Sequence, residues 1–284
     1  MSGLVQPLSP DDLPGCLALV RDRGRLPEKR LWRLLFAVGT VYGLRAGDGG
    51  LAGAVVLTRY GRELAAIGML LVAARYGGQG LGRRLMTHAL AEAGDATVFL
   101  HATESARPLY AKLGFVSAGT THTHAGEFAL PGGAAEGAAG SAAGSRPAEQ
   151  GDLPAIRELD ARCHGADRAC LVRFLPGFTE HLRVVGRHGF VTGYAGGWRN
   201  ADHVVIGPVI AGSADDARIL VADIAGSVAG PVRLDLGGRH PQVREWATGH
   251  GLAPRASSAV MVRGGRSLPG DRARWFAPVM QALG

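Results

Sequence analysis

The residues of this chain best suited to chemistry form a glycine-rich segment, GGQGLGRRL, at Gly77–Leu85. It lies between an apolar stretch typical of a strand and a stretch with the apolar spacing of an amphipathic helix. The start of a helix leaves backbone N–H groups unpaired and carries a partial positive charge, so a phosphate can bind there wherever no Cβ blocks its approach. Arg83 and Arg84, in the first helical turn, can add charged hydrogen bonds to that phosphate. The segment therefore predicts a phosphate-binding loop.

Two common phosphate-binding loops do not fit this segment. A Rossmann dinucleotide loop requires the spacing G-x-G-x-x-G, and counting from Gly78 and Gly80 the sixth position is Arg83. A Walker A loop requires Gly-Lys followed by Ser or Thr, and the sequence contains no such run. Neither a dinucleotide nor a P-loop nucleotide site is therefore favoured.

A second motif follows, in which the strand-like VFLHAT precedes the helix-like ESARPLYAKLGF at residues 98–115. Together with MLLVAARYGGQGLGRRL at 69–85, it resembles the two signature blocks of the GNAT superfamily of N-acetyltransferases, R/Q-x-x-G-x-G/A after a strand and N-x-x-A-x-x-L-Y-x-x-x-G-F. Gly80 and Gly82 take the glycine positions of the first block, while Gly77 stands where Arg or Gln is usual. Tyr110 takes the tyrosine position of the second block, and Thr103 stands where Asn is commonest.

This resemblance implies that acetyl-CoA is the co-substrate and that the strand before the loop separates from its neighbour. Main-chain groups of that strand would then bind the pantetheine arm, and Arg75 or Arg83 could compensate for the side chain lost at Gly77. By the same resemblance Tyr110 is the general acid for the departing CoA thiolate, although an aromatic residue that only packs its helix on the sheet is the simpler interpretation. The acetyl-CoA-binding residues implied are Leu70, Leu71, Val72, Gly77, Gly78, Gln79, Gly80, Leu81, Gly82, Arg83 and Thr103.

Acyl transfer to an amine also needs a group that removes the amine proton. By analogy Glu63, near the start of the strand before the loop, is the best-placed acid, and an exposed glutamate at a strand end is the alternative interpretation. Glu104 and His101, which flank the start of the tyrosine helix, are further candidates.

Metal and nucleophile chemistry have weaker support. His122 and His124 alternate along a strand, but no third ligand lies nearby, so we expect surface histidines and no metal. The three cysteines, Cys16, Cys163 and Cys170, have no metal-type spacing, and we expect buried or inert thiols. Direct attack of an amine on a thioester needs no enzyme nucleophile.

The elements that position these residues occur twice along the chain. The motif around Asp12–Pro14 recurs 140 positions later at Asp152–Pro154, and a Gly/Ala/Ser-rich stretch separates the two copies. We therefore expect an acetyl-CoA-binding GNAT domain at 1–130, a linker at 131–143 and a second GNAT-like domain at 144–284. The fold class expected is α/β, with a mixed sheet flanked by helices in each domain. Apolar patterns predict first-half strands at 4–8, 41–45, 51–58, 64–72, 96–101 and from 115, with helices at 11–21, 28–36, 81–93 and 105–113. They predict second-half helices at 153–162, 168–175, 214–227 and 242–248, with strands around 183 and 190 and at 203–210, 232–236 and 259–263.

The second copy has lost the chemistry of the first. Where the first half has its glycine loop, the second has Gly212–Asp216, in which Ser213 and Asp216 fit a capping box and two carboxylates would repel a pyrophosphate. Trp246 stands near the tyrosine position, and an indole cannot act as a useful acid. We expect one cofactor site per chain, and the final segment at 268–284 resembles the docking tail of tandem GNAT-like proteins.

The net charge of +7 comes almost wholly from arginine, which suits a GC-rich genome better than a nucleic-acid surface, since no basic run with interleaved aromatics is present. No apolar run is long enough to span a membrane, and the first residues do not resemble a signal peptide, so we expect a cytoplasmic protein with no nucleic-acid or membrane partner. A homodimer is compatible with the tandem arrangement. The function expected is transfer of an acetyl group to an amine of a small molecule, with a non-catalytic acyl-CoA sensor or scaffold, or a protein amine acetyltransferase, as alternatives.

Overall fold

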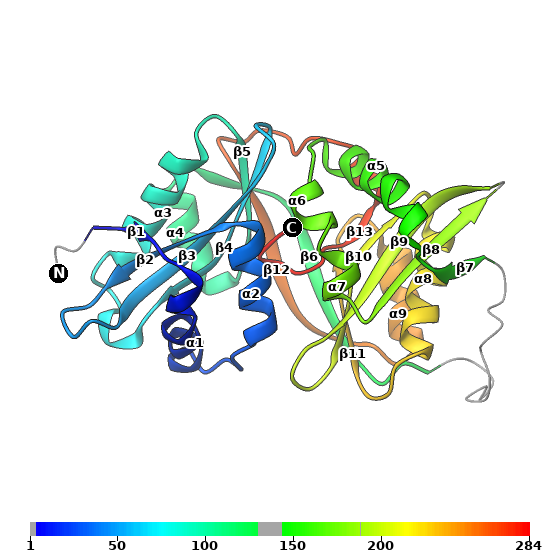
Figure 1. Ribbon diagram of the computed structural model, residues 1–284, viewed down its shortest axis with the longest axis horizontal. Helices are drawn as coiled ribbons and strands as arrows, with labels where there is room; N and C mark the ends of the chain where they lie inside the picture. Colours follow the sequence, from blue (N-terminus) through cyan, green and yellow to red (C-terminus); the bar gives the residue numbers. More distant parts are fainter. Residues whose placement is uncertain (1–3, 130–143, 188) are drawn as a thin grey trace.

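A computed structural model describes residues 4–129, 144–187 and 189–284 of the chain, and the linker predicted at 131–143 lies outside them. The first half alternates strands and helices in the predicted order (Figure 1). Strand β3 is buried along almost its whole length, because helices cover both faces of the sheet, and this explains its continuous apolar sequence. The elements are β1 (Gln6–Pro7), η1 (Pro10–Asp12), α1 (Leu13–Asp22), α2 (Lys29–Val38), β2 (Thr40–Arg45), β3 (Leu51–Tyr60), β4 (Leu64–Val72), η2 (Ala74–Tyr76), α3 (Leu81–Ala93), β5 (Thr97–Ala102), η3 (Glu104–Ala106), α4 (Arg107–Lys112) and β6 (Phe115–Gly126).

The second half repeats this order, except that two short helices stand where the first half has α2 and that a short final strand is added. Its elements are β7 (Ser145–Pro147), η4 (Gln150–Asp152), α5 (Leu153–His164), α6 (Ala169–Val172), α7 (Leu175–Phe178), β8 (His181–Arg187), β9 (Phe190–Arg199), β10 (Val204–Ala211), α8 (Ala214–Gly226), β11 (Val232–Gly237), α9 (Pro241–Gly249), β12 (Ala253–Arg263), η5 (Arg272–Arg274) and β13 (Trp275–Ala277). The two copies predicted from the internal repeat are therefore present.

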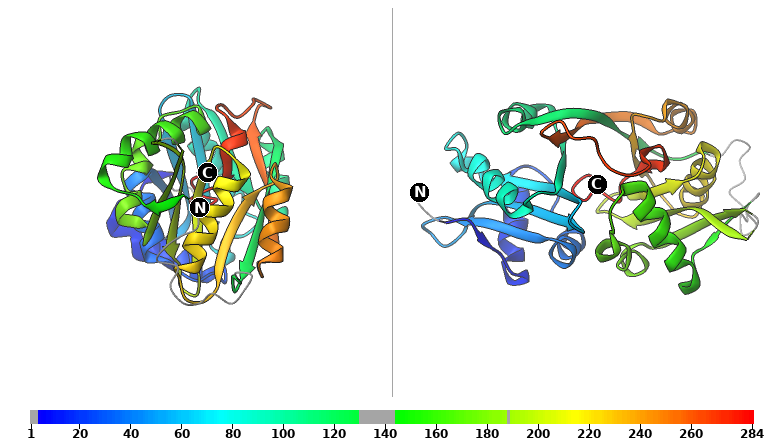
Figure 2. Two further views of the ribbon diagram at one scale, coloured as in Figure 1. Left: turned by 90° about the vertical axis from the view of Figure 1, so that its right-hand side faces the viewer. Right: turned by 90° about the horizontal axis from the view of Figure 1, so that it is seen from above.

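The two halves share one sheet rather than having one each. Within the described residues it has 13 strands, in the order β1-β2-β3-β4-β5-β12-β6-β11-β10-β9-β8-β7, with β13 paired to β10. Strand β12 of the second half lies between β5 and β6, and β6 of the first half lies between β12 and β11. Each half thus completes its sheet with the last long strand of the other. Seen from above, β6 and β12 form an arch that joins the halves (Figure 2).

The pairing of β6 with β12 is symmetric. Thr121 pairs with Ser258, which lies 137 positions later, and the unpaired bulge residues Ala118 and Arg255 are also 137 positions apart. Thr121 and Ser258 therefore face their own counterparts, and on either side of them the pairs Thr120–Ala259 and His122–Ser257 are equivalent with the halves exchanged, as they would be across a twofold axis. This offset identifies equivalent positions in the two halves.

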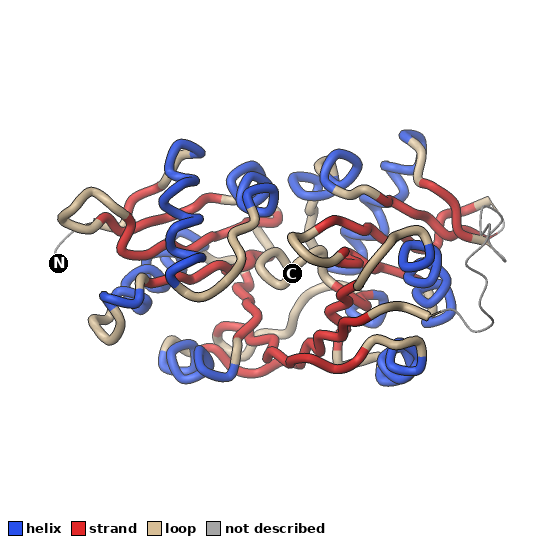
Figure 3. Tube along the Cα trace, turned by 90° about the horizontal axis from the view of Figure 1, so that it is seen from below, coloured by secondary structure: helices blue, strands red, loops and turns tan. Residues whose placement is uncertain are grey.

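Three hydrophobic clusters hold the layers together. One lies under α3 and α4, where Leu85 and Met86 are fully buried, and another lies under α8 and α9. The third joins the halves, because it contains Trp32 of α2 and Tyr60 of β3 together with Tyr194 of β9. Strands run as a continuous band between the two groups of helices, and the C-terminal end of the chain lies between the halves (Figure 3).

The expectation that His122 and His124 lie on the surface is wrong for His124, which is only 4% exposed. The reason is that β6 is an internal strand, paired on both edges. His124 Nδ1 lies 3.3 Å from the carbonyl oxygen of His122, and burial lowers the pKa of His124.

Candidate active site

The glycine-rich loop leads into α3 with open backbone donors. Gly80 is the N-cap of α3, and no side chain caps this helix. Gly78 and Gly80 have φ values of 74° and 76°, and a Cβ built at either position would meet no atom within 4 Å. Glycine is therefore needed here for backbone conformation and not for lack of space. Because the first-turn N–H groups of a helix have no intrahelical partner, the loop provides both the donors and the room for a phosphate.

The charged groups around the loop are partly paired. Arg75 forms an ion pair with Asp48 at 2.6 Å, and both side chains are more than half exposed. Asp22, at the end of α1, accepts a hydrogen bond from the N–H of Ala74 at 2.5 Å and so fixes the start of η2. An exposed ion pair contributes little to stability, so Arg75 can exchange its partner at low cost, and Arg83 lies exposed on α3.

Strands β4 and β5 diverge just before the loop. They pair only from Leu64 to Ala66, opposite Thr97–Phe99, and beyond this β5 pairs with β12. Strand β4 then bulges, because Met69 and Leu70 together lie opposite one residue of β3, and Met69 has a φ of 50°. No other strand of the described chain pairs with the β5-facing edge of Leu70–Val72. The separation implied by the family resemblance is thus present.

The two signature motifs converge where α3 begins. A Cβ built on Gly82 would lie 3.6 Å from Leu109 of α4, 3.7 Å from Val72 and 3.9 Å from Leu70. The loop, the diverging end of β4 and helix α4 therefore surround one small space. Tyr110, the next residue of α4, lies in the same cluster and packs edge to face on Phe115.

Tyr110 holds its proton strongly. Its side chain is 8% exposed, and burial raises the pKa of its hydroxyl to about 12, against a smaller opposing effect of the Arg25 guanidinium. At neutral pH this phenol is therefore a hydrogen-bond donor. Arg25 lies in the loop between α1 and α2, so the charge of that loop acts on the tyrosine.

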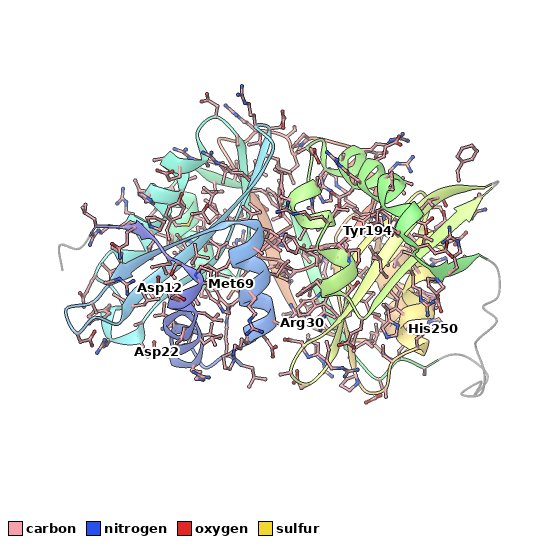
Figure 4. The ribbon with its side chains drawn as sticks, in the orientation of Figure 1. Asp12, Asp22, Arg30, Met69, Tyr194 and His250 are labelled. Carbon is pink, nitrogen blue, oxygen red and sulfur yellow. The ribbon has the colours of Figure 1, made fainter. Side chains whose placement is uncertain are left out.

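A pocket of about 560 Å³ lies between the two halves, and Met69 forms part of its wall. Figure 4 labels Met69 in the first half and Arg30 on α2. Arg30 connects the halves, because it donates a hydrogen bond to the carbonyl oxygen of Phe178 at 2.6 Å. The ionisable lining residues are Arg25 and Glu28 from the first half, and Asp202, His203, Arg233 and Asp235 from the second; Thr103 of the first half also lines the pocket. The pocket is thus built by both halves.

The carboxylates of this pocket differ in their partners. Asp235 is 3% exposed and accepts a hydrogen bond from Thr123 at 2.6 Å and two from Arg233 at 3.1 and 2.9 Å. Asp202 lies 2.6 Å from the ring of His203. Glu28, which precedes α2, is half-buried and has no ion pair among the described residues. The sequence marked Glu28 only as a helix start, so its place in the pocket was not predicted.

The structure does not bring the other proton-acceptor candidates to this pocket. Glu63 is exposed in the turn before β4 and bonds to the N–H of Arg62; at about 3.3 Å per residue it lies roughly 25 Å along the strand from Leu71. Glu104 is exposed at the start of η3. His101 is buried, and burial lowers its pKa to about 4, so it is a poor base.

The second half has filled both parts of the corresponding site with its own atoms. Ser213 caps α8 by accepting a hydrogen bond from the N–H of Asp216 at 3.1 Å, which is one of the two hydrogen bonds of the predicted capping box. The Asp216 carboxylate, 2% exposed, bonds to Arg187 at 2.8 Å and Thr192 at 3.1 Å. Strands β10 and β11 also diverge, after Ile206, but here β13 pairs with the end of β10. Among the residues of the second half that the structure describes, this place therefore has neither an open phosphate loop nor an open strand edge.

The chain after β13 crosses to the first half and packs against β4. Gly68 lies so close to this segment that a Cβ on it would come within 2.6 Å of the carbonyl oxygen of Ala282. Tyr60 donates a hydrogen bond to the carbonyl oxygen of Leu283 at 2.6 Å, and Trp198 donates one to Val279 at 2.9 Å. The predicted docking tail therefore docks inside its own chain and forms part of the pocket wall.

Other sites receive little support. The described residues contain no group of three side chains arranged to hold a metal ion. Cys16 and Cys163 are fully buried, and burial raises the pKa of both thiols to about 12, which makes them poor nucleophiles. In the described ranges, no helix has the length and apolar character needed to cross a bilayer.

Comparisons with known proteins agree with this arrangement. Two family models described as acetyltransferase (GNAT) domains match the chain, one over residues 40–131 and the other over 156–277. The uncharacterised N-acetyltransferase YitH of Bacillus subtilis is 25% identical over 254 residues, 89% of this chain and 88% of that protein. A candidate acetyltransferase from Pyrococcus horikoshii shares the fold with a TM-score of 0.82 and 17% identity, covering 100% of this chain and 97% of that one. A tandem GNAT protein from the clavulanic acid biosynthesis pathway matches with a TM-score of 0.62 and 17% identity, over 93% and 99% of the two chains.

Proposed function

This chain belongs to the GNAT superfamily and carries two GNAT domains in tandem, and from that we propose an N-acetyltransferase with one active site, which transfers an acetyl group from acetyl-CoA to the amine of a small molecule. The observation that carries this proposal is the asymmetry between the halves. The first half keeps an uncapped helix start and an open strand edge, whereas a carboxylate and strand β13 occupy the equivalent places in the second.

The residues of the first half fit the co-substrate. Backbone N–H groups of Gly78–Arg83 would bind the pyrophosphate, and main-chain groups of Leu70–Val72 would bind the pantetheine arm along the open edge of β4. Acetyl-CoA supplies the acyl thioester. Tyr110 would hold its proton at Oη and give it to the departing sulfur, which suits a phenol that burial keeps protonated.

We place the acceptor in the pocket between the halves, beyond Met69. An amine enters as an ammonium ion, which the carboxylates of Glu28 and Asp202 would attract, and it must lose a proton before it can attack. Glu28 is the pocket carboxylate contributed by the first half, so we assign it the role of proton acceptor, directly or through a water molecule. A pocket walled by both halves and by the C-terminal segment favours a small molecule over a protein amine.

The test is acetyl-CoA binding by calorimetry paired with thiol release over a panel of small amines and lysine peptides. We expect binding, turnover with at least one small amine, and a fall in kcat of about 10²–10³-fold in Tyr110→Phe with unchanged acetyl-CoA affinity. Tyr76→Phe, which removes a hydroxyl beside the loop but not from α4, is the matched control and should retain activity. Binding without turnover on any amine would replace this proposal with an acyl-CoA sensor.

A further inference from the structure

A second pocket, of about 600 Å³, is lined in part by residues of the same two strands, β6 and β12. Its β6 and β12 lining is equivalent to that of the pocket between the halves. Gly119, Thr120 and Val260 line this second pocket, and their counterparts at the offset of 137, which are Ala256, Ser257 and Thr123, line the first. This part of the second pocket's wall is therefore equivalent, by the symmetry of the two strands, to part of the wall of the pocket between the halves.

The chemistry of the two pockets differs. The pocket between the halves has three carboxylates in its lining, whereas the second pocket has none and instead has Arg239, Arg266 and Arg272, together with His122. Neither Arg239 nor Arg272 forms an ion pair with a carboxylate of the described chain. The ionisable side chains that line the second pocket are thus three arginines and one histidine, and none of them carries a negative charge.

Two buried donors in this pocket have no partner within the described residues. The indole Nε1 of Trp275 is one, and that side chain is only 6% exposed; Nη1 of Arg272 is the other. The Arg272 guanidinium stacks over the Trp275 ring at 4.9 Å, so both donors belong to one small region. An unpaired buried donor destabilises the folded chain, and a bound acceptor would remove that cost.

The surrounding charges also favour an anion. Burial, together with the nearby positive charges of Arg168 and Arg239, lowers the pKa of Arg272 to about 10. Asp160, whose charge also acts on Arg272, has other partners, because it accepts a hydrogen bond from Tyr194 at 2.6 Å and lies 3.1 Å from Nε of Arg168. An anion placed between these arginines would offset their mutual repulsion.

We propose that this pocket binds a small anion bearing a phosphate or carboxylate group, held by Arg239, Arg272 and the indole N–H of Trp275. Arginine forks match the oxygens of both groups in pairs, and the lining offers donors without competing acceptor carboxylates. This binding is independent of the acetyl transfer proposed for the first half, because the two sites share no charged residue.

The experiment titrates the full chain with inorganic phosphate and, separately, with citrate, by calorimetry and thermal unfolding in the presence of saturating acetyl-CoA. Saturation keeps phosphate away from the glycine loop, and comparison of the two anions distinguishes a phosphate site from a carboxylate site. We expect at least one anion to bind and raise Tm, and its Kd to rise at least tenfold in Arg239→Gln and in Arg272→Gln. Arg255→Gln, an exposed arginine on β12 outside the pocket, should bind as the wild type does.

Arg239 is exposed, so its variant remains informative even if the buried Arg272 variant fails to fold. Absence of binding by either anion, or equal loss of affinity in Arg239→Gln and Arg255→Gln, would overturn the proposal. Loss of acetyl transfer with anion binding intact would count against the proposed function alone.

Discussion

Replacing Gly80 with alanine should weaken acetyl-CoA binding without disturbing the core. Gly80 has a φ of 76°, and a Cβ there meets no atom within 4 Å, so the substitution causes backbone strain but no clash. A left-handed conformation costs an L-residue roughly 1–2 kcal/mol relative to glycine. This strain energy can appear in two ways. Either the loop keeps its shape and the free energy of unfolding falls, or the loop relaxes, its N–H groups turn away from the phosphate and the affinity for acetyl-CoA falls.

The same strain energy sets the upper limit of both effects. If the loop relaxes fully, 1–2 kcal/mol corresponds to a Kd for acetyl-CoA that rises about 5–30-fold. If it does not, the free energy of unfolding falls by the same amount while Kd is unchanged. Calorimetry with acetyl-CoA and urea unfolding of the same preparations measure both quantities. We expect most of the energy to appear in Kd, because the loop is exposed and packed by nothing.

Gly230→Ala is the matched control, since Gly230 has a φ of 84° and equally open surroundings but lies in the second half. It should lose a similar amount of stability and bind acetyl-CoA normally. If Gly80→Ala changes neither Kd nor stability, the reasoning from backbone conformation is refuted. If Gly230→Ala weakens binding as much as Gly80→Ala, the assignment of the phosphate loop is refuted.

Three further predictions concern the parts that support the site. Gly68→Ala places a Cβ within 2.6 Å of the main chain of Ala282, so it should lower the free energy of unfolding in urea by about 1–3 kcal/mol. Gly82→Ala, with contacts of 3.6–3.9 Å, should leave that free energy unchanged. Equal stabilities of the two variants would contradict this. His101 has a pKa of about 4 in the folded chain and 6.5 as its ordinary value, so between these pH values the unfolded chain binds a proton that the folded chain does not. The free energy of unfolding must therefore fall as the pH drops from 6.5 to 4, by on the order of 3 kcal/mol. His101→Gln should flatten that pH profile, and an unchanged profile would show that another group is responsible. Asp216→Ala removes a buried carboxylate and leaves the exposed Arg187 and the Thr192 hydroxyl without this partner, so it should cost about 1–3 kcal/mol yet leave acetyl-CoA affinity unchanged. A loss of affinity would mean that the second half has a cofactor site after all.

The sequence predicted well what local patterns determine. Apolar periodicity placed the helices and strands close to their bounds, and the glycine spacing identified the loop before α3 because glycine is the residue that adopts the positive φ found at Gly80. The cap of α8 by Ser213 was predicted for the same reason, since a cap depends on residues only three positions apart.

Long-range pairing was not predictable in the same way. Nothing in the period of β6 says whether its neighbour is β5 or β12, so the exchange of strands and the burial of His124 were missed. Glu28 was missed because a loop reveals its contacts only once both halves are placed around it. Glu63 was expected near the site only by analogy with the family. The structure places it in the turn before β4, at the end of the strand opposite to Leu71.

The exchanged strands set a schedule for the newborn chain. Strand β6 ends at Gly126 and its neighbour β12 begins at Ala253, so at a synthesis rate of about 5–20 residues per second the ribosome delivers the second strand on the order of 10 s after the first. During that interval β5 and β6 carry unpaired edges, which are templates for pairing between molecules. The sheet of the nascent first half therefore stays incomplete until β12 is synthesised. Interruption of translation in the second half would release a fragment with an incomplete sheet that is prone to aggregate.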